Sequence, residues 1–234
     1  MKTKSNTAFS RRTFVAGALS ACGTSLIHGA PSASAQSTPK KPTMYTHQDF
    51  YDNGEFNAGK AKQAYFDMMK RFGYPVWESF KGEQLWAIDF SLGDFMHAGM
   101  GGIFWINENH KGGGYLGHEI FLLPGQMIVE HAHVTCSTCP PKRESWLVRH
   151  GSIYSFSVQK TAKGFPEGVQ IPESQRASAT CNTAELISEG GVGSLNKAEA
   201  KHFMMAGPEG AIVTEFGTFH DNEGLRFSNP KVKF

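Results

Sequence analysis

The 234-residue sequence lacks the features that mark several classes of protein. No apolar run reaches the roughly 18 residues that a membrane-spanning helix needs, and no collagen, heptad or longer repeat recurs along the chain. Lysine and arginine form no run, so the sequence offers no basic surface for nucleic acid. Hydrophobic residues nevertheless make up 40% of the chain, which is enough for a buried core and indicates one globular domain.

The first 35 residues differ in charge from the rest of the chain. They contain four basic side chains and no acidic one, so the remainder holds 19 basic and 21 acidic residues. Arg11 and Arg12 precede an apolar stretch at 14–27, and the small residues Ala33-Ser34-Ala35 follow it. This order resembles a twin-arginine (Tat) signal peptide, and we expect cleavage after Ala35 and export to the periplasm. A lipobox-like segment ending at Cys22 is the rival site and would leave a lipid anchor there.

Cysteine is scarce, and cleavage after Ala35 would leave Cys136, Cys139 and Cys181. The periplasm permits disulfides, and three cysteines leave the pairing open. Cys136 can pair with Cys139, or one of these two can pair with Cys181. A zinc knuckle needs a second Cys-x-x-Cys pair, which the sequence lacks. The sequence therefore favours a disulfide or free thiols over thiolate metal ligands.

A linker and one helix precede the main domain. Residues 36–46 are rich in Pro, Lys and Thr, which is typical of a linker. Residues 57–72 place Ala61, Tyr65 and Met68 at helical spacing, and Gly73 follows as a stop signal. The pattern predicts an amphipathic helix that packs against the main domain, and we assign 36–83 to this extension and 84–234 to the domain itself.

From about residue 84 the chain consists of short segments with β-strand character. Turn-forming glycines and prolines separate them, as at Gly151 and at 207–210. Many strands at this spacing predict an all-β antiparallel barrel or double-sheet jelly roll. The expected strands are 85–90, 103–106, 118–123, 127–133, 144–150, 152–158, 185–188 and 211–216.

Residues able to bind a metal ion lie in and after one of these strands. His131 and His133 are two apart, so they share one face of a strand. Lys142, Glu144 and Trp146 share a face of the next strand, and a barrel interior that receives the histidines would also receive this carboxylate. Two imidazoles and a carboxylate are a common ligand set for a divalent metal.

These residues resemble the first motif of the cupin superfamily, G-x5-H-x-H followed by E-x6-G. Gly125, His131, His133, Glu144 and Gly151 fit each fixed spacing, but ten residues separate His133 from Glu144 where ordinary cupins have three or four. The longer gap is similar to that of D-lyxose isomerase-type cupins. This similarity runs from about residue 85 to residue 230, and it implies a single cupin barrel.

The resemblance also implies a fourth ligand, a histidine in the second cupin motif. His202 stands directly before a segment similar to the family's strand, whereas His220 lies beyond it in a polar turn. The resemblance selects His202 and leaves His220 as the alternative or as a substrate contact. It implies manganese as the metal, although the ligand types also suit Fe, Co, Ni or Zn. It further implies a homodimer paired through edge strands.

The resemblance implies a sugar isomerase of the D-lyxose/D-mannose type, acting through an enediolate. Glu215 matches the family's strand and is the expected catalytic base, and Lys142 is expected to steady a developing oxyanion. Glu130 is out of phase with the histidines and should point away. His118 has no ligand-like spacing and is interpreted as surface or structural. The alternatives are a cupin dioxygenase and an exported sugar-binding protein without activity.

Overall fold

The computed structural model describes residues 41–111 and 113–234, so the predicted signal peptide lies outside the described residues. The described part is mostly β-structure, with few and short helices. The helical elements are η1 (His47–Phe50), α1 (Ala58–Phe72), η2 (Glu78–Lys81), α2 (Glu173–Arg176) and η3 (Asn222–Gly224). The strands are β1 (Tyr51–Asp52), β2 (Glu55–Phe56), β3 (Trp86–Ile88), β4 (Met100–Glu108), β5 (Tyr115–Leu122), β6 (His131–His133), β7 (Glu144–Ser157), β8 (Thr183–Ser188), β9 (Val192–Ser194), β10 (His202–Gly217) and β11 (Leu225–Phe227).

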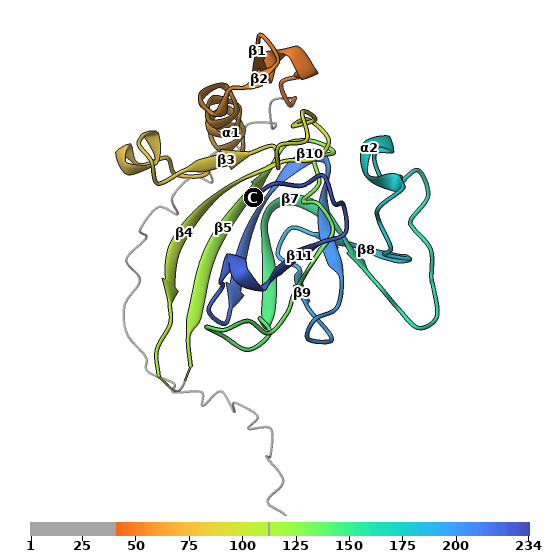
Figure 1. Cartoon of the computed structure of the whole chain (residues 1–234). Coiled ribbons are helices and arrows are strands. Elements are labelled where there is room, and N and C mark those ends of the chain that lie inside the picture. The colour runs from red at the N-terminus through yellow and green to blue at the C-terminus, as the bar shows by residue number, and fades with distance from the viewer. Residues whose placement is uncertain (1–40, 112) are drawn as a thin grey trace, which may run out of the picture. The chain divides into compact units, whose positions relative to one another are not determined.

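One curled antiparallel sheet contains every strand from β3 onward, which confirms the all-β jelly-roll prediction (Figure 1). Its order is β11-β6-β10-β5-β4-β3, and β7 pairs with β10, β8 and β9. Strand β10 is central because its first residue pairs with β6, its second half pairs with β5, and β7 runs along its other edge. Residues far apart in the sequence are therefore brought to the inner face of the sheet through β10.

The two glycine-containing turns expected near the middle of the domain are bends inside strands. Strand β7 continues through Gly151, and β10 continues through 207–210, where the pairing register shifts between Ala206 and Ala211. Gly151 and Gly210 both have positive φ, of 75° and 79°. A Cβ atom at Gly151 would lie 2.0 Å from the Gly210 carbonyl oxygen, so the two strands approach each other as only glycine permits.

Helix α1 packs on the outer face of the sheet, as predicted. The Asn57 side chain accepts a hydrogen bond from the Lys60 N–H at 3.0 Å and caps its start, and Gly73 ends it in the left-handed conformation. The Tyr65 hydroxyl donates a buried hydrogen bond of 2.8 Å to Gln126. The buried face of α1 forms one cluster with Phe121 and other residues of the sheet, so the helix covers this face.

The inner face of the sheet forms a second hydrophobic cluster. Ile212 joins the cluster under α1, whereas its neighbour Val213 joins the inner one, as the two-residue period of a strand requires. Val148 and Ile120 are buried in the same inner cluster. Within the described ranges, no helix is long and apolar enough to cross a membrane.

Candidate metal and sugar site

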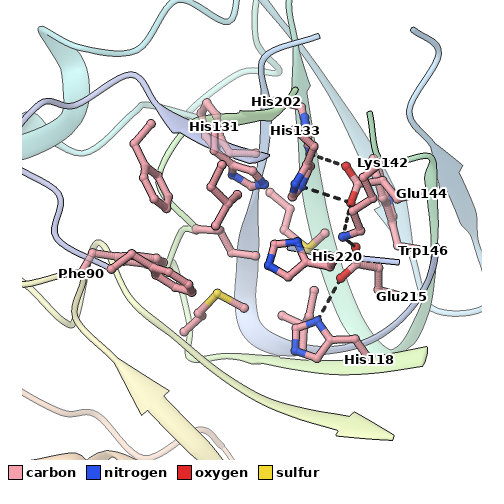
Figure 2. Close-up of a pocket in the computed structure, with 18 of the residues that line it drawn as sticks. Phe90, His118, His131, His133, Lys142, Glu144, Trp146, His202, Glu215 and His220 are labelled. Atoms are coloured by element: carbon pink, nitrogen blue, oxygen red, sulfur yellow. Dashed lines mark hydrogen bonds and ion pairs between the residues drawn. The ribbon is translucent and has the colours of Figure 1, made fainter. Parts of the chain in front are cut away.

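His131 and His133 lie on the short strand β6 and face the inside of the curled sheet (Figure 2). Their ring centroids are 4.9 Å apart, so the predicted pairing of two imidazoles on one strand face is present. The His131 Nδ1 lies 2.9 Å from the Val129 carbonyl oxygen. Because a carbonyl can only accept, this nitrogen carries the proton, and Nε2 of His131 is left with its lone pair free.

His202 is the first residue of β10 and pairs directly with His131 across the strands. The two ring centroids are 4.5 Å apart, and the His202 Nδ1 lies 2.9 Å from the Ala200 carbonyl oxygen. The ring nitrogens offered by His131, His133 and His202 lie within 4.8 Å of one another. The register of β6 against β10 therefore assembles three imidazoles at one point.

Glu144 begins β7 and lies beside these histidines despite the ten residues that separate it from His133. Its Oε1 is 2.7 Å from the His202 Nε2, and its Oε2 is 3.7 Å from the His133 Nε2. The carboxylate is buried. All four residues predicted as metal ligands are thus brought together, and their role as ligands stays a prediction.

The four residues fit a divalent metal by the chemistry of their donors. The His133 Nε2 is buried and has no hydrogen-bond partner. A buried ring nitrogen normally has one, so this atom is available to a ligand at the cluster. Burial, with the neighbouring His202 adding to it, lowers the pKa of His131 to about 3, so this imidazole is neutral near pH 7. Burial also lowers the pKa of His133. Burial opposes charge on His202, but Glu144 outweighs burial and raises the pKa of this imidazole, so a metal ion would displace the proton between the two groups. Neutral imidazoles and one carboxylate are suitable ligands for Mn, Fe, Co, Ni or Zn.

Lys142 and Glu215, the predicted catalytic pair, form a buried ion pair next to Glu144. The Lys142 Nζ lies 2.8 Å from the Glu144 Oε2 and also contacts the Glu215 Oε1. Burial opposes charge on the lysine, but the two carboxylates outweigh it and raise the pKa of Lys142. Burial would raise the pKa of Glu215, but Lys142 and a hydrogen bond from His118 lower it below its usual value. Glu215 is therefore held as a carboxylate.

His118 was predicted to be a surface or structural residue, and this prediction is wrong. The residue lines the same pocket as the predicted ligands. Its Nδ1 is 2.9 Å from the Glu215 Oε2, and it is Glu215's direct partner in the pairing of β5 with β10. The ring stacks on Phe104, with centroids 4.3 Å apart, and on Trp86. The only signal in the sequence was the two-residue period that puts His118 in phase with the buried Ile120.

His220 lines the pocket but does not join the cluster of three histidines. Its ring centroid is 5.4 Å from that of His133, and its Nε2 is 2.9 Å from the Asn222 side-chain oxygen. The His220 ring thus lies beside His133, but His202 is the residue that brings a ring nitrogen within 4.8 Å of those of both paired histidines and contacts Glu144.

Glu130 points away from the histidines, as its phase predicted. Its carboxylate accepts hydrogen bonds from the backbone N–H groups of Thr180 and Cys181 and from the Ser228 hydroxyl. Burial would raise its pKa, but these hydrogen bonds lower it. Glu130 ties together segments behind the site and does not line the pocket.

The three described cysteines are free thiols. The Cys136 and Cys139 sulfur atoms are 3.3 Å apart in the loop between β6 and β7, within the ten residues that separate His133 from Glu144. Cys181 is buried elsewhere, against the Lys201 carbonyl. The geometry favours Cys136 with Cys139, rather than Cys181, as the pair that oxidation would join.

Comparison with known proteins gives relatives in sequence and neighbours in fold. No family model matches the chain. It is 29% identical over 155 residues, 64% of its own length and 80% of the other, to a D-lyxose/D-mannose isomerase of Thermosediminibacter oceani. It is 27% identical over 174 residues, 74% of its length and 91% of the other, to a D-lyxose ketol-isomerase of Cohnella laeviribosi. Its curated relatives are aldose–ketose isomerases.

Solved structures of L-ribose isomerases share the fold. The enzyme of Acinetobacter sp. DL28 in complex with L-ribose superposes with a TM-score of 0.57 at 16% identity, over 74% of this chain and 91% of that one. The Cellulomonas parahominis enzyme without ligand gives 0.58 at 15% identity, over the same shares. At these identities the likeness supports the fold alone, a curled antiparallel sheet of the jelly-roll type.

Proposed function

We propose that this protein is a metal-dependent aldose–ketose isomerase of the D-lyxose/D-mannose type. One observation carries the proposal: ring nitrogens of three imidazoles lie within 4.8 Å of one another and meet Glu144 directly beside the buried Lys142–Glu215 pair. A metal site and an adjacent carboxylate base are the two parts that such a reaction needs. The names of the relatives point to the same reaction.

The ligands would be His131, His133, Glu144 and His202, with manganese as the expected ion. Such an ion would hold two neighbouring oxygens of the sugar and polarise its carbonyl group. Interconversion of aldose and ketose moves a proton from C2 to C1 and another from O2 to O1, through an enediolate, and needs no oxidant. A group that removes the carbon-bound proton must lie beside these atoms.

Glu215 is the residue suited to remove that proton. It is ionised because Lys142 and His118 stabilise its charge, so it starts as an acceptor. Lys142 is held in the charged state by Glu144 and Glu215, so it donates to oxygen and does not act as a base. The two side chains therefore have different roles: the Glu215 carboxylate moves protons, and the Lys142 ammonium group stabilises negative charge on oxygen.

The test is turnover of D-lyxose and D-mannose with Mn²⁺ under nitrogen in D₂O. We expect ketose to form with solvent deuterium at C1, because the base exchanges its proton with solvent. Glu215→Gln should lower kcat by about 10²- to 10⁴-fold while bound metal is unchanged. The matched control is Glu119→Gln, which removes a buried carboxylate that the Thr214 hydroxyl and the Trp105 indole contact outside the pocket.

Three results would count against the isomerase assignment, and a fourth would count against the role of Glu215. No ketose from any aldose would remove the isomerase assignment, and oxygen consumption with Fe²⁺ would favour a dioxygenase. Binding of sugar without turnover would favour a receptor. Unchanged turnover in Glu215→Gln would remove this residue from the mechanism.

We also propose that the chain is exported through its twin-arginine segment. Arg11→Lys with Arg12→Lys should retain the protein inside the cell, because the paired arginines are the recognised feature. Lys2→Arg with Lys4→Arg is the control, since it alters basic residues outside the pair. Fractionation and the mass of the mature protein distinguish cleavage after Ala35 from a lipid anchor at Cys22, and equal export of both variants would contradict the proposal.

A further inference from the structure

The two sides of the pocket differ in chemistry. Twenty described residues line it, and twelve of them are aliphatic, aromatic or methionine side chains. Figure 2 shows Lys142, Glu144 and Glu215 along one side and Phe90 on the opposite side. Phe90 packs with Phe227, with centroids 6.0 Å apart. The substrate must therefore meet charge on one side and hydrocarbon on the other.

The polar residues of the pocket already have partners or proposed roles. Three histidines and Glu144 form the proposed metal site, and Lys142 and His118 each contact Glu215. His220 is the eighth polar lining residue, and its Nδ1, like the Nε2 of His118, is buried without a hydrogen-bond partner. These two nitrogens can meet substrate hydroxyl groups on the polar side, because His118 contacts Glu215 and the His220 ring lies 5.4 Å from that of His133. Among the described residues that line the pocket there is no Ser, Thr, Asn, Gln, Asp, Arg or Tyr, whose side chains could form hydrogen bonds with sugar hydroxyl groups.

The indole N–H groups do not supply the missing partners. The Trp86 and Trp146 nitrogens are both buried, and the Trp86 indole lies against the backbone of β4, because a Cβ atom at Gly102 would be 2.9 Å from its Cε2. The Trp146 nitrogen faces β9, because a Cβ atom at Gly193 would lie 2.2 Å from it. A hydroxyl group placed against the apolar side would lose its hydrogen bonds to water without replacement.

We propose that the substrate of this pocket is an aldose or ketose that is deoxygenated at the end remote from C1 and C2. The inference rests on the proposed function, because it takes C1 and C2 to lie at the metal and Glu215. It adds that the far end of the carbon chain meets Phe90, Met204 and their apolar neighbours. A terminal methyl group fits that environment, whereas a terminal hydroxyl group does not.

D-Mannose and 6-deoxy-D-mannose provide the test, since they differ only in the C6 hydroxyl. With the Mn²⁺-loaded protein we expect kcat/KM to be about 10- to 100-fold higher for the 6-deoxy sugar, which is the usual discrimination of an apolar pocket against an added hydroxyl. Equal or better turnover of D-mannose would overturn the inference and leave the proposed function intact. If neither sugar is converted, the proposed function fails, and the inference is tested by binding instead. In that case the 6-deoxy sugar should raise the Tm of the protein more than D-mannose does, and an equal or larger rise with D-mannose would overturn the inference.

A pair of neighbouring methionines gives a matched test of the apolar side. Met204 lines the pocket, whereas Met205 packs in a separate cluster with Phe156. Met204→Gln offers a hydrogen bond to a hydroxyl group and should reduce the preference for the 6-deoxy sugar by roughly fivefold. Met205→Gln should leave the preference unchanged, and circular dichroism should show both variants folded. An equal change of preference in the two variants, or none in Met204→Gln, would contradict the inference.

Discussion

The metal-binding and the acid–base halves of the pocket are held in place by different kinds of contact. In the metal-binding half, the rings of His131 and His202 are each fixed by the carbonyl group of the residue two positions earlier. In the acid–base half, Glu215 is fixed by Lys142, 73 residues away, and by His118, 97 residues away. In the first half strand register brings the rings together but local carbonyl groups orient them, whereas in the second half the long-range contacts themselves orient Glu215.

This difference predicts how each half responds to mutation. Loss of a locally held imidazole removes a metal donor and leaves the rest of the site in place. Loss of a long-range contact leaves the donors intact and changes the charge and orientation of Glu215. The two halves should therefore separate in experiments that measure bound metal and turnover independently.

The largest expected effect is that of His202→Ala compared with His220→Ala. Removing His202 takes away one of three convergent imidazoles, so metal affinity should fall by more than the roughly 10- to 100-fold seen when only a supporting residue is lost. His220→Ala should retain the metal, because its ring lies outside the cluster. Elemental analysis of purified protein measures both. Retained metal in His202→Ala with loss in His220→Ala would reverse the assignment.

A smaller effect is expected for His118→Phe, which keeps an aromatic ring against Phe104 but removes the hydrogen bond to Glu215. The pKa of Glu215 is lowered in part by that hydrogen bond, so the variant should raise it. Because the base must be ionised, the acidic limb of the kcat profile should move to higher pH, with kcat lowered by about 10- to 100-fold and metal content unchanged.

His118→Asn distinguishes a positioning role from a structural one. Its amide can still donate to Glu215, so the acidic limb should return toward that of the unmodified protein, even though the stacking is lost. If the profiles of His118→Phe and of the unmodified protein coincide, His118 does not act through Glu215.

The sequence predicted the locally encoded parts of the molecule and missed those that depend on register. The spacing of His131 and His133 was sufficient to predict a shared strand face, and the period of helix α1 was sufficient to predict its buried side. His118 could not be assigned to the site, because only its pairing with Glu215 across β5 and β10 brings it there. Glycine and proline at 207–210 were interpreted as a turn, because a bend inside a strand uses the same residues.

The charges in the site illustrate the same limit. Lys142 was predicted to be in phase with Glu144, but no pattern in the sequence indicated that it would also neutralise Glu215. That contact depends on the end of β10 lying beside the start of β7, where Gly217 pairs with Glu144. The apolar side of the pocket likewise combines strands that are separated along the chain, so its composition became visible only in the fold.

Gly151→Ala should have the smallest direct effect on the site, because Gly151 does not line the pocket, and a large effect on stability. This residue has positive φ and lies against the Gly210 carbonyl oxygen, so alanine would add both backbone strain and a backbone clash. We expect the free energy of unfolding to fall by about 3 kcal/mol or more, compared with about 1 kcal/mol for Gly168→Ala, which has the same sign of φ and open space around it. Urea unfolding in the presence of a metal chelator measures both without the contribution of metal binding. The bend aligns β7 with β10, so the protein that remains folded should lose turnover while it still binds metal. Loss of turnover and of bound metal together would show that the two halves of the pocket are not held independently.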